Sequence, residues 1–231
     1  MEIGPGLGVL TRELLEVAGE VHCVELDNKV IEYLKDNFSA ELTSGKLKLI
    51  EGDALKIDYK AQGLEDFKFK IISNLPYSIT SGFFRKFLEH GPKPEEIIVM
   101  IQKEVAQRMV AEKGKMNLLA LSAQFFAEVK ILFEVSAHCF WPEPKVVSAV
   151  IKLKLKEKLP KVDVKALFRL MHLGFSAKRK QLHNNLTAGF KLQGLSAGQV
   201  KERITKAGLS PENRAQDLEL ADWLRLLKEF N

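Results

Sequence analysis

The chain has 231 residues, of which 46% are hydrophobic and 28% charged, and its formal net charge is +5. This length allows one large domain, or one of ordinary size with a small appendage. No apolar run reaches the roughly 18 residues that a membrane span requires, and no signal peptide opens the chain. The composition therefore favours a globular cytoplasmic protein and excludes one built of transmembrane helices.

The two cysteines, Cys23 and Cys139, lie far apart in apolar stretches. This placement predicts two buried free thiols in a reducing compartment. The five histidines show no ligand spacing relative to the cysteines, so the sequence predicts no metal site.

The first part of the chain alternates β-like runs with helix-like runs. The apolar, β-rich runs are Val21–Glu25, Leu47–Ile50, Lys70–Asn74 and Ile97–Ile101, and the runs with helical spacing are Val9–Ala18 and Lys29–Phe38. Strands that alternate with helices predict an α/β fold with a parallel sheet covered on both faces. Only Met1–Ile3 precedes the first glycine turn, whereas strands usually run about five residues. We therefore expect the chain to begin in the middle of a domain.

Two further β-like runs, Glu128–Val135 and Ser148–Lys156, follow closely on one another and predict antiparallel strands at one side of the sheet, the second with a solvated lysine face. Pro160 then marks a domain boundary. Beyond it the pattern is helical over Val164–Gly174, Arg179–Leu186, Ala197–Ala207 and Glu219–Phe230, and Ser210–Glu212 has the features of a helix start. We expect a catalytic domain over residues 1–158 and a helical domain over residues 159–231.

Basic residues concentrate after residue 145. The lysines of 152–161 are followed by three consecutive cations, Lys178, Arg179 and Lys180, at the start of a predicted helix. Such runs are usually solvated faces, but this distribution is also compatible with a polyanionic partner whose phosphates meet these cations.

Three predicted strand ends carry groups that suit a nucleoside. Glu2–Gly8 forms a GxGxG turn, in which glycines permit a tight turn and close approach of a ligand. Glu25 ends the next strand, where a carboxylate can accept both hydroxyls of a ribose, and Asp53 with Ala54 can read the edge of an adenine. Singly, these motifs are also explained by a tight turn, a solvated strand end and an Asx turn. Together they favour an adenosine-bearing cofactor without phosphates.

The fourth strand ends in Asn74–Tyr77. The lone pair of an exocyclic amine is delocalised into its ring, so methylation requires acceptors that draw the amine towards tetrahedral geometry. The Asn74 side-chain oxygen and the Leu75 or Pro76 carbonyl can accept the two amine hydrogens, and Tyr77 offers a ring on which an extruded base can stack. The alternative is a turn that merely contains proline.

A proline-rich loop follows later in the chain, over Phe140–Ser148. Its two prolines, two residues apart, predict a rigid loop. Phe140 is placed to clamp the second face of the adenine, opposite Tyr77. We interpret Trp141 as a hydrophobic anchor for the loop.

These motifs, in this order, resemble the small-subunit ribosomal RNA adenine dimethyltransferases of the KsgA type. The resemblance spans almost the whole chain. It rests on Glu2–Gly8, Val24–Asp27, Gly52–Leu55, Asn74–Ile79, Gln102–Ala106, Phe140–Val150 and Phe175–Leu186.

The resemblance implies a Rossmann-like methyltransferase domain with a small all-helical C-terminal domain, and S-adenosylmethionine as cofactor. The implied reaction is N6,N6-dimethylation of two adjacent adenosines in the 3′-terminal hairpin of small-subunit rRNA, in an immature ribosomal subunit. It also implies a monomer without metal. The implied cofactor-binding residues are Glu2, Gly4, Gly6, Glu25, Leu26, Asp53, Ala54 and Asn74. The implied catalytic residues are Asn74, Leu75, Pro76, Tyr77 and Phe140, and the implied RNA-binding residues are Lys145, Lys178, Arg179 and Lys180.

Three alternatives remain open at this stage. A sister family that methylates large-subunit rRNA and confers macrolide resistance shares the catalytic motifs, although residues 178–186 resemble the small-subunit type. A DNA adenine methyltransferase would use the same chemistry, and an assembly factor would keep the RNA contacts without catalysis. The chain also departs from the family at its start, because family members carry an upstream segment that helps to cover the cofactor.

Overall fold

The structure is a computed structural model that describes residues 1–230. It divides the chain into two compact units. The first comprises Met1–Ala106 and Phe126–Glu157, and the second comprises residues 107–125 together with the chain from Lys158 onward. The sequence analysis placed residues 107–125 in the first domain, whereas the structure groups them with the second unit.

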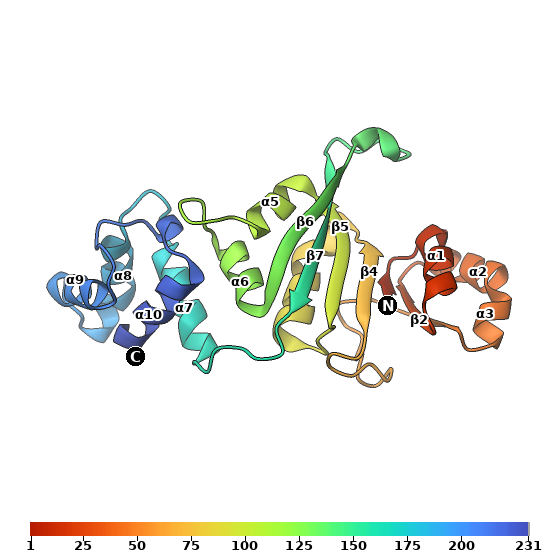
Figure 1. Cartoon of the computed structure of the whole chain (residues 1–231), viewed down its shortest axis with the longest axis horizontal. Coiled ribbons are helices and arrows are strands. Elements are labelled where there is room, and N and C mark those ends of the chain that lie inside the picture. The colour runs from red at the N-terminus through yellow and green to blue at the C-terminus, as the bar shows by residue number, and fades with distance from the viewer. Residues whose placement is uncertain (231) are drawn as a thin grey trace. The chain divides into compact units, whose positions relative to one another are not determined.

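Two groups of strands form the framework of the first unit (Figure 1). In the described part of the chain, a three-stranded parallel sheet has the order β1-β2-β3, and a four-stranded sheet has the order β4-β5-β7-β6. Strand β7 is antiparallel to both β5 and β6, as the sequence predicted. The strands are β1 (Glu2–Ile3), β2 (Val21–Glu25), β3 (Leu47–Glu51), β4 (Lys70–Asn74), β5 (Glu96–Gln102), β6 (Ala127–Val135) and β7 (Ser148–Leu155).

Strands β1 and β4 connect the two sheets. The Ile72 N–H donates to the Met1 carbonyl at 3.0 Å, and the buried Ser73 hydroxyl donates to the Ile3 carbonyl at 2.5 Å. The strands therefore follow one another in the order β3-β2-β1-β4-β5-β7-β6, and the carboxyl ends of β1 to β4 meet at one edge. This is the predicted α/β arrangement.

Helices cover the sheet because their apolar residues fall on one face. Leu14 and Leu15 of α1 and Leu34 of α2 pack with Val21 and Leu47 of the neighbouring strands in one buried cluster. The helices assigned wholly or partly to this unit are α1 (Val9–Val17), α2 (Asn28–Asn37), α3 (Ser39–Thr43), α4 (Thr80–Arg85), which continues into a π-helical turn over Lys86–His90, α5 (Lys103–Met109) and α6 (Leu118–Phe126). Short 3₁₀ turns occupy Tyr77–Ile79 and Ala137–Cys139.

The second unit is helical and packs around Trp223, which is fully buried. Phe175 stacks on Trp223 with ring centroids 5.9 Å apart. A Cβ at Gly174 would lie 2.3 Å from the Trp223 ring, so only glycine allows this approach. Residues 107–125 join this unit because the Gly114 and Met116 N–H groups donate to the Gln216 carbonyl. Its remaining elements are α7 (Val164–Gly174), α8 (Leu182–Phe190), α9 (Ala197–Lys206), α10 (Leu220–Phe230) and 3₁₀ turns over Lys191–Gln193 and Ala215–Asp217.

Two predicted helix starts are wrong. Helix α8 begins at Leu182, not at Arg179, because the Asn185 side chain donates to the Gly174 and Ala177 carbonyls and holds the preceding residues as a turn. Ser210–Glu212 also forms a turn, because the Ser210 N–H donates to the Asn213 side chain. These local side-chain bonds compete with helix formation.

Candidate active site

A hollow of about 440 Å³ lies at the carboxyl ends of β1 to β4. This is the edge of an open α/β sheet at which ligands bind. Each strand end that the sequence singled out contributes to the hollow or borders it. The lining residues are Ile3, Gly4, Val24, Glu25, Leu26, Asp27, Gly52, Asp53, Ala54, Pro76, Ser78 and Ile79.

Gly4 is the residue at which the glycine turn packs closely against the end of β4. Its φ is +67°, a backbone conformation that disfavours residues with a Cβ, and its N–H donates to the Val24 carbonyl at 2.9 Å. A Cβ at this position would lie 3.3 Å from Pro76 Cγ. The predicted tight turn therefore also permits close packing of the first and fourth strand ends.

Glu25 is held by the turn that follows it. Its Oε1 accepts the N–H groups of Leu26 and Asp27 at 2.7 and 3.0 Å. The carboxylate is thus oriented at the wall of the hollow, where it can accept ligand hydroxyls through its remaining acceptor sites. The Leu26 side chain beside it is 67% exposed, which leaves an apolar surface at the rim.

Asp53 lies in a loop that two side chains hold in place, Tyr59 from the same loop and Lys86 from the turn after α4. Its Oδ1 accepts the Leu55 N–H at 2.9 Å, so the Asx turn that was one interpretation of this motif is present beside the hollow. The buried Tyr59 hydroxyl donates to the Ala54 carbonyl at 2.9 Å, and Lys86 Nζ donates to the Leu55 carbonyl at 2.9 Å.

Burial raises the pKa of Tyr59, and the Asp53 carboxylate adds to this effect. Burial also lowers the pKa of Lys86, against the opposite influence of Asp53. Both side chains therefore serve as hydrogen-bond donors that fix the loop around Asp53. Sequence analysis did not single out either residue.

Glu2 lies outside the lining of the hollow, although it belongs to the glycine motif. Its carboxylate is buried beneath α1, where Thr11 donates to Oε2 at 2.6 Å and Cys23 Sγ lies 3.6 Å away. Burial raises the pKa of Glu2. Burial, and then the Glu2 charge, raise the pKa of the Cys23 thiol to about 12. Glu2 therefore packs against α1 instead of facing the hollow. Gly6 (φ +55°) lies within the glycine turn and does not line the hollow either.

A second hollow, of about 340 Å³, adjoins the first. Asn74–Tyr77 line it together with Phe140, Trp141, Pro142 and Pro144. The structure thus brings together all five residues expected to act on the target base. Pro76 lines both hollows, so a ligand in one and a ligand in the other meet at this residue.

The backbone of this motif is held by neighbouring strands. Leu75 is buried, and its N–H donates to the Met100 carbonyl at 3.3 Å. The Pro76 carbonyl accepts the Ile79 N–H at 3.1 Å in the following 3₁₀ turn. This bond occupies one of the two lone pairs of the Pro76 carbonyl, which makes the Leu75 carbonyl the preferred candidate acceptor for an amine hydrogen.

Tyr77 makes a contact that the sequence did not reveal. Its hydroxyl lies 2.6 Å from the hydroxyl of Ser148, which is fully buried at the start of β7. Ser148 directly follows the proline-rich loop that contains Phe140. This hydrogen bond therefore joins the two backbone segments that carry Tyr77 and Phe140, the rings predicted to hold the adenine.

Two expectations for the loop between β6 and β7 are wrong. Trp141 is 97% exposed and therefore does not anchor the loop in a core. Its neighbours Pro142 and Glu143 are exposed as well, so no apolar surface covers the indole. Cys139 is also exposed, because it lies in the 3₁₀ turn of the same loop, whereas Cys23 is buried as expected.

The predicted RNA-binding cations are all exposed. Lys145 lies in the proline-rich loop of the first unit. Lys178, Arg179 and Lys180 lie in the turn before α8, in the second unit. The solvated lysine face predicted for β7 is only partly present, because Lys152 is half-buried in an ion pair with Glu96.

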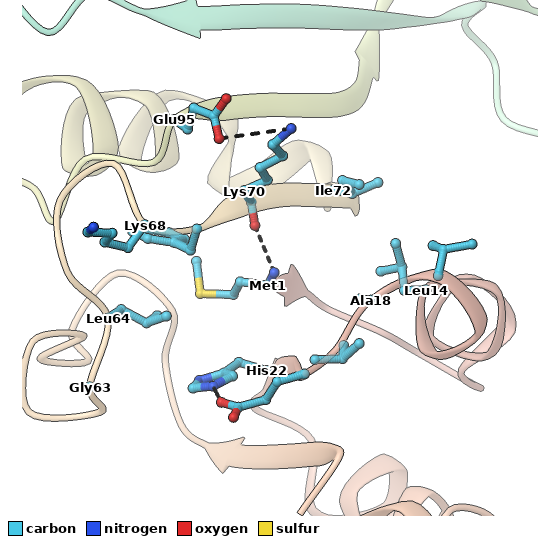
Figure 2. Close-up of a pocket in the computed structure, with 14 residues that line it drawn as sticks. Met1, Leu14, Ala18, His22, Gly63, Leu64, Lys68, Lys70, Ile72 and Glu95 are labelled. Carbon is cyan, nitrogen blue, oxygen red and sulfur yellow. Dashed lines mark hydrogen bonds and ion pairs between the residues drawn. The ribbon is translucent and has the colours of Figure 1, made fainter.

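A further hollow, of about 450 Å³, opens at the amino-terminal ends of the strands (Figure 2). There the Met1 amine donates to the Lys70 carbonyl at 2.7 Å, and Lys70 Nζ lies 3.9 Å from Glu95. This edge carries none of the motif side chains described above, and ligands of parallel sheets bind at the opposite edge. We therefore place the chemistry at the carboxyl ends.

Among residues 1–230, no group of three or more His, Cys, Asp or Glu side chains is arranged to hold a metal ion. Nor does any helix in the described part of the chain have the length and apolar character needed to cross a membrane.

Comparison with known proteins shows to which family the chain belongs. The family described as "Ribosomal RNA adenine dimethylase" matches residues 1–231. The chain belongs to this family. A protein named "Ribosomal RNA small subunit methyltransferase A" from Dehalococcoides mccartyi (strain CBDB1) is 39% identical over 235 residues, covering 100% of this chain and 78% of the relative. The protein of that name from Acaryochloris marina is 37% identical, and the match covers 98% of this chain and 84% of the relative.

Solved structures agree with the family assignment. A dimethyladenosine transferase from Plasmodium falciparum matches with a TM-score of 0.83 and 29% identity, over 100% of this chain and 88% of the other. The 23S rRNA methyltransferase ErmE matches with a TM-score of 0.73 and 24% identity, over 99% of this chain and 88% of the other. The match to ErmE shows a shared fold. The match to the dimethyladenosine transferase confirms the predicted α/β methyltransferase fold within the family.

Proposed function

We propose that this chain transfers methyl groups from S-adenosylmethionine to N6 of two adjacent adenosines in the 3′-terminal hairpin of small-subunit rRNA. One observation carries this proposal: Pro76 lines both hollows at the sheet edge. One hollow suits a nucleoside cofactor and the other suits a flat base. The names of the relatives favour the small-subunit substrate over the large-subunit alternative.

The residues of the first hollow fit S-adenosylmethionine. Its volume falls in the range of small-molecule sites, about 300–1,000 Å³. Glu25 would accept the ribose hydroxyls, and Asp53 would accept from the adenine amino group. Leu26 and Ile79 offer apolar surface to the adenine ring, and Gly4 leaves room for the backbone to approach. When bound, the cofactor supplies an electrophilic methyl group on a sulfonium.

The residues of the second hollow would prepare the amine. Asn74 Oδ1 and the Leu75 carbonyl accept its two hydrogens, which draws the nitrogen lone pair out of conjugation with the ring. Tyr77 and Phe140 hold the base from its two faces, as enzymes that extrude a base require. Holding both partners in reacting geometry supplies much of the rate enhancement, and one N6 proton leaves to water. In the second transfer a single N–H remains for the two acceptors.

The test is methyl transfer from labelled S-adenosylmethionine to immature small ribosomal subunits, followed by nucleoside analysis. We expect N6,N6-dimethyladenosine from the unaltered chain. Asn74→Ala should lower kcat roughly 10²–10³-fold, the usual effect of deleting one polar contact to a reacting centre, and leave RNA affinity unchanged. Asn37→Ala, which removes an exposed side chain at the end of α2, is the matched control.

Three outcomes would contradict the proposal. If the only product is monomethyladenosine, the second transfer does not occur. If Asn74→Ala methylates as the unaltered chain does, Asn74 does not prepare the amine. If neither chain methylates although both bind RNA, the chain is an RNA-binding assembly factor instead.

A further inference from the structure

Trp141 is exposed beside the second hollow with nothing above its indole. It is 97% exposed, whereas Trp223, the other tryptophan, is fully buried. Trp141 also lines the same hollow as Asn74–Tyr77 and Phe140. Aromatic rings at the rim of such a site are surfaces on which unpaired bases stack. We propose that Trp141 is a second base-binding surface, which takes the unpaired base next to the target adenine.

The two rings differ in how far they are exposed. Phe140 is half-buried, whereas Trp141 is 97% exposed. The half-buried Phe140 therefore holds the target adenine in the hollow, and the exposed indole of Trp141 is available to the neighbouring base.

The loop holds Trp141 in a defined position. The Cys139 and Phe140 N–H groups donate to the Ser136 and Ala137 carbonyls, each at 3.1 Å. Pro142 and Pro144 follow, and their rings fix the backbone on the other side of Trp141. Because the backbone is already fixed, less conformational entropy is lost when a base stacks on the ring that it carries.

The charges near Trp141 favour a nucleotide over a protein or a lipid. The exposed Lys145, four residues further along, can meet the phosphate of the nucleotide whose base stacks on Trp141. Nearby, His138 Nδ1 lies 2.9 Å from Glu143 Oε1, so the acidic residue of the loop already has a partner. The inference rests on the proposed function, because it requires an adenine in the adjoining hollow.

The test is a binding cycle with the full chain and synthetic RNA hairpins, measured by fluorescence anisotropy. Each hairpin carries one unpaired target adenosine, and its 5′ or 3′ neighbour is either a normal nucleotide or an abasic site. Stacking on an aromatic side chain changes affinity by about tenfold per base. We therefore expect Trp141→Ala to weaken binding about tenfold when both neighbours are intact. It should weaken binding less than twofold when the neighbour that stacks is abasic.

Two further variants control for structure. Trp141→Phe keeps a ring and should retain most of the affinity. Val17→Ala removes another exposed apolar side chain of the same unit and should change nothing. If Trp141→Ala weakens binding equally to intact and abasic hairpins, or not at all, the inference is wrong. If the variant binds hairpins normally and fails only on ribosomal subunits, Trp141 contacts a ribosomal protein and the inference is also wrong.

The methyl-transfer assay separates this inference from the proposed function. Methyl transfer without any dependence on the neighbouring base contradicts the inference alone. Dependence on the neighbouring base without methyl transfer supports the stacking surface and contradicts the proposed function alone.

Discussion

The Tyr77 hydroxyl lies 2.6 Å from the Ser148 hydroxyl, across 71 residues of sequence. Tyr77 follows β4, and Ser148 begins β7, directly after the loop that carries Phe140. This bond joins the two backbone segments whose rings face the second hollow. The distance between the rings, and thus the space for an adenine, depends on it.

We expect Ser148→Ala to lower kcat/KM for RNA about fivefold, because a lost hydrogen bond of this kind is worth about 1 kcal/mol. Steady-state methyl transfer provides the measurement. Tyr77→Phe should produce the same loss, and the double variant should lose no more than either single one, since all three lack the same bond. Ser148→Thr should restore activity. Additive losses, or no rescue, would show that the bond does not position the ring.

A second prediction concerns Gly4, whose φ of +67° and closeness to Pro76 both disfavour a side chain. Gly4→Ala should destabilise the fold by about 1 kcal/mol through backbone strain. It should also lower kcat/KM about tenfold, because displacing Pro76 misaligns the two hollows.

Gly45→Ala is the matched control for Gly4→Ala. Gly45 has a φ of +75°, and a Cβ there would meet nothing within 4 Å. We expect a similar loss of stability in urea unfolding with unchanged methyl transfer. If both variants lose activity equally, strain rather than the contact with Pro76 is the cause.

The sequence predicted the order of the strand ends well because each one is a local pattern. An apolar run that ends in Glu25, Gly52–Asp53 or Asn74 can be recognised without knowledge of the fold, and parallel topology then brings these residues to one edge. The division of roles within the glycine motif was not predictable. Glu2 and Ile3 are neighbours in an extended strand, so one side chain faces α1 and the other faces the hollow.

Contacts between distant residues left no trace in the sequence. Lys86 follows α4, 31 residues after Leu55, and it stands in no motif that could have predicted its bond to the loop around Asp53. Trp141 was misinterpreted for a different reason. Most large apolar residues are buried, and its exposure becomes visible only when the surface around it is known.

A third prediction uses the buried Glu2 carboxyl. Burial raises its pKa in the folded protein above the ordinary value of 4.5. At pH values between the ordinary pKa and the raised pKa, the folded chain binds more protons than the unfolded chain. The free energy of unfolding therefore falls as the pH rises from the ordinary pKa to the raised one. The full slope for one group is about 1.4 kcal/mol per pH unit.

Glu2→Gln removes this titration while keeping an acceptor for Thr11. Relative to the unaltered chain, the variant should therefore become progressively more stable as pH rises from about 4.5 towards neutrality. Urea unfolding at a series of pH values measures the difference. A constant difference across this window would mean that Glu2 titrates normally in the folded protein.

The last prediction concerns the exposed cations of the turn before α8. If Lys178–Lys180 contact RNA phosphates, replacing all three by alanine should weaken binding and reduce its dependence on salt. The slope of log affinity against log salt concentration should decrease in magnitude by about 2, since each phosphate contact contributes roughly 0.7–0.9 to it. The exposed lysines Lys46, Lys60 and Lys113, replaced together, provide a control with the same change in net charge. Because a general loss of positive charge affects both triple variants alike, a specific contact requires that the first lowers the slope clearly more than the second. Equal slopes for the two variants would assign the RNA contacts to another surface.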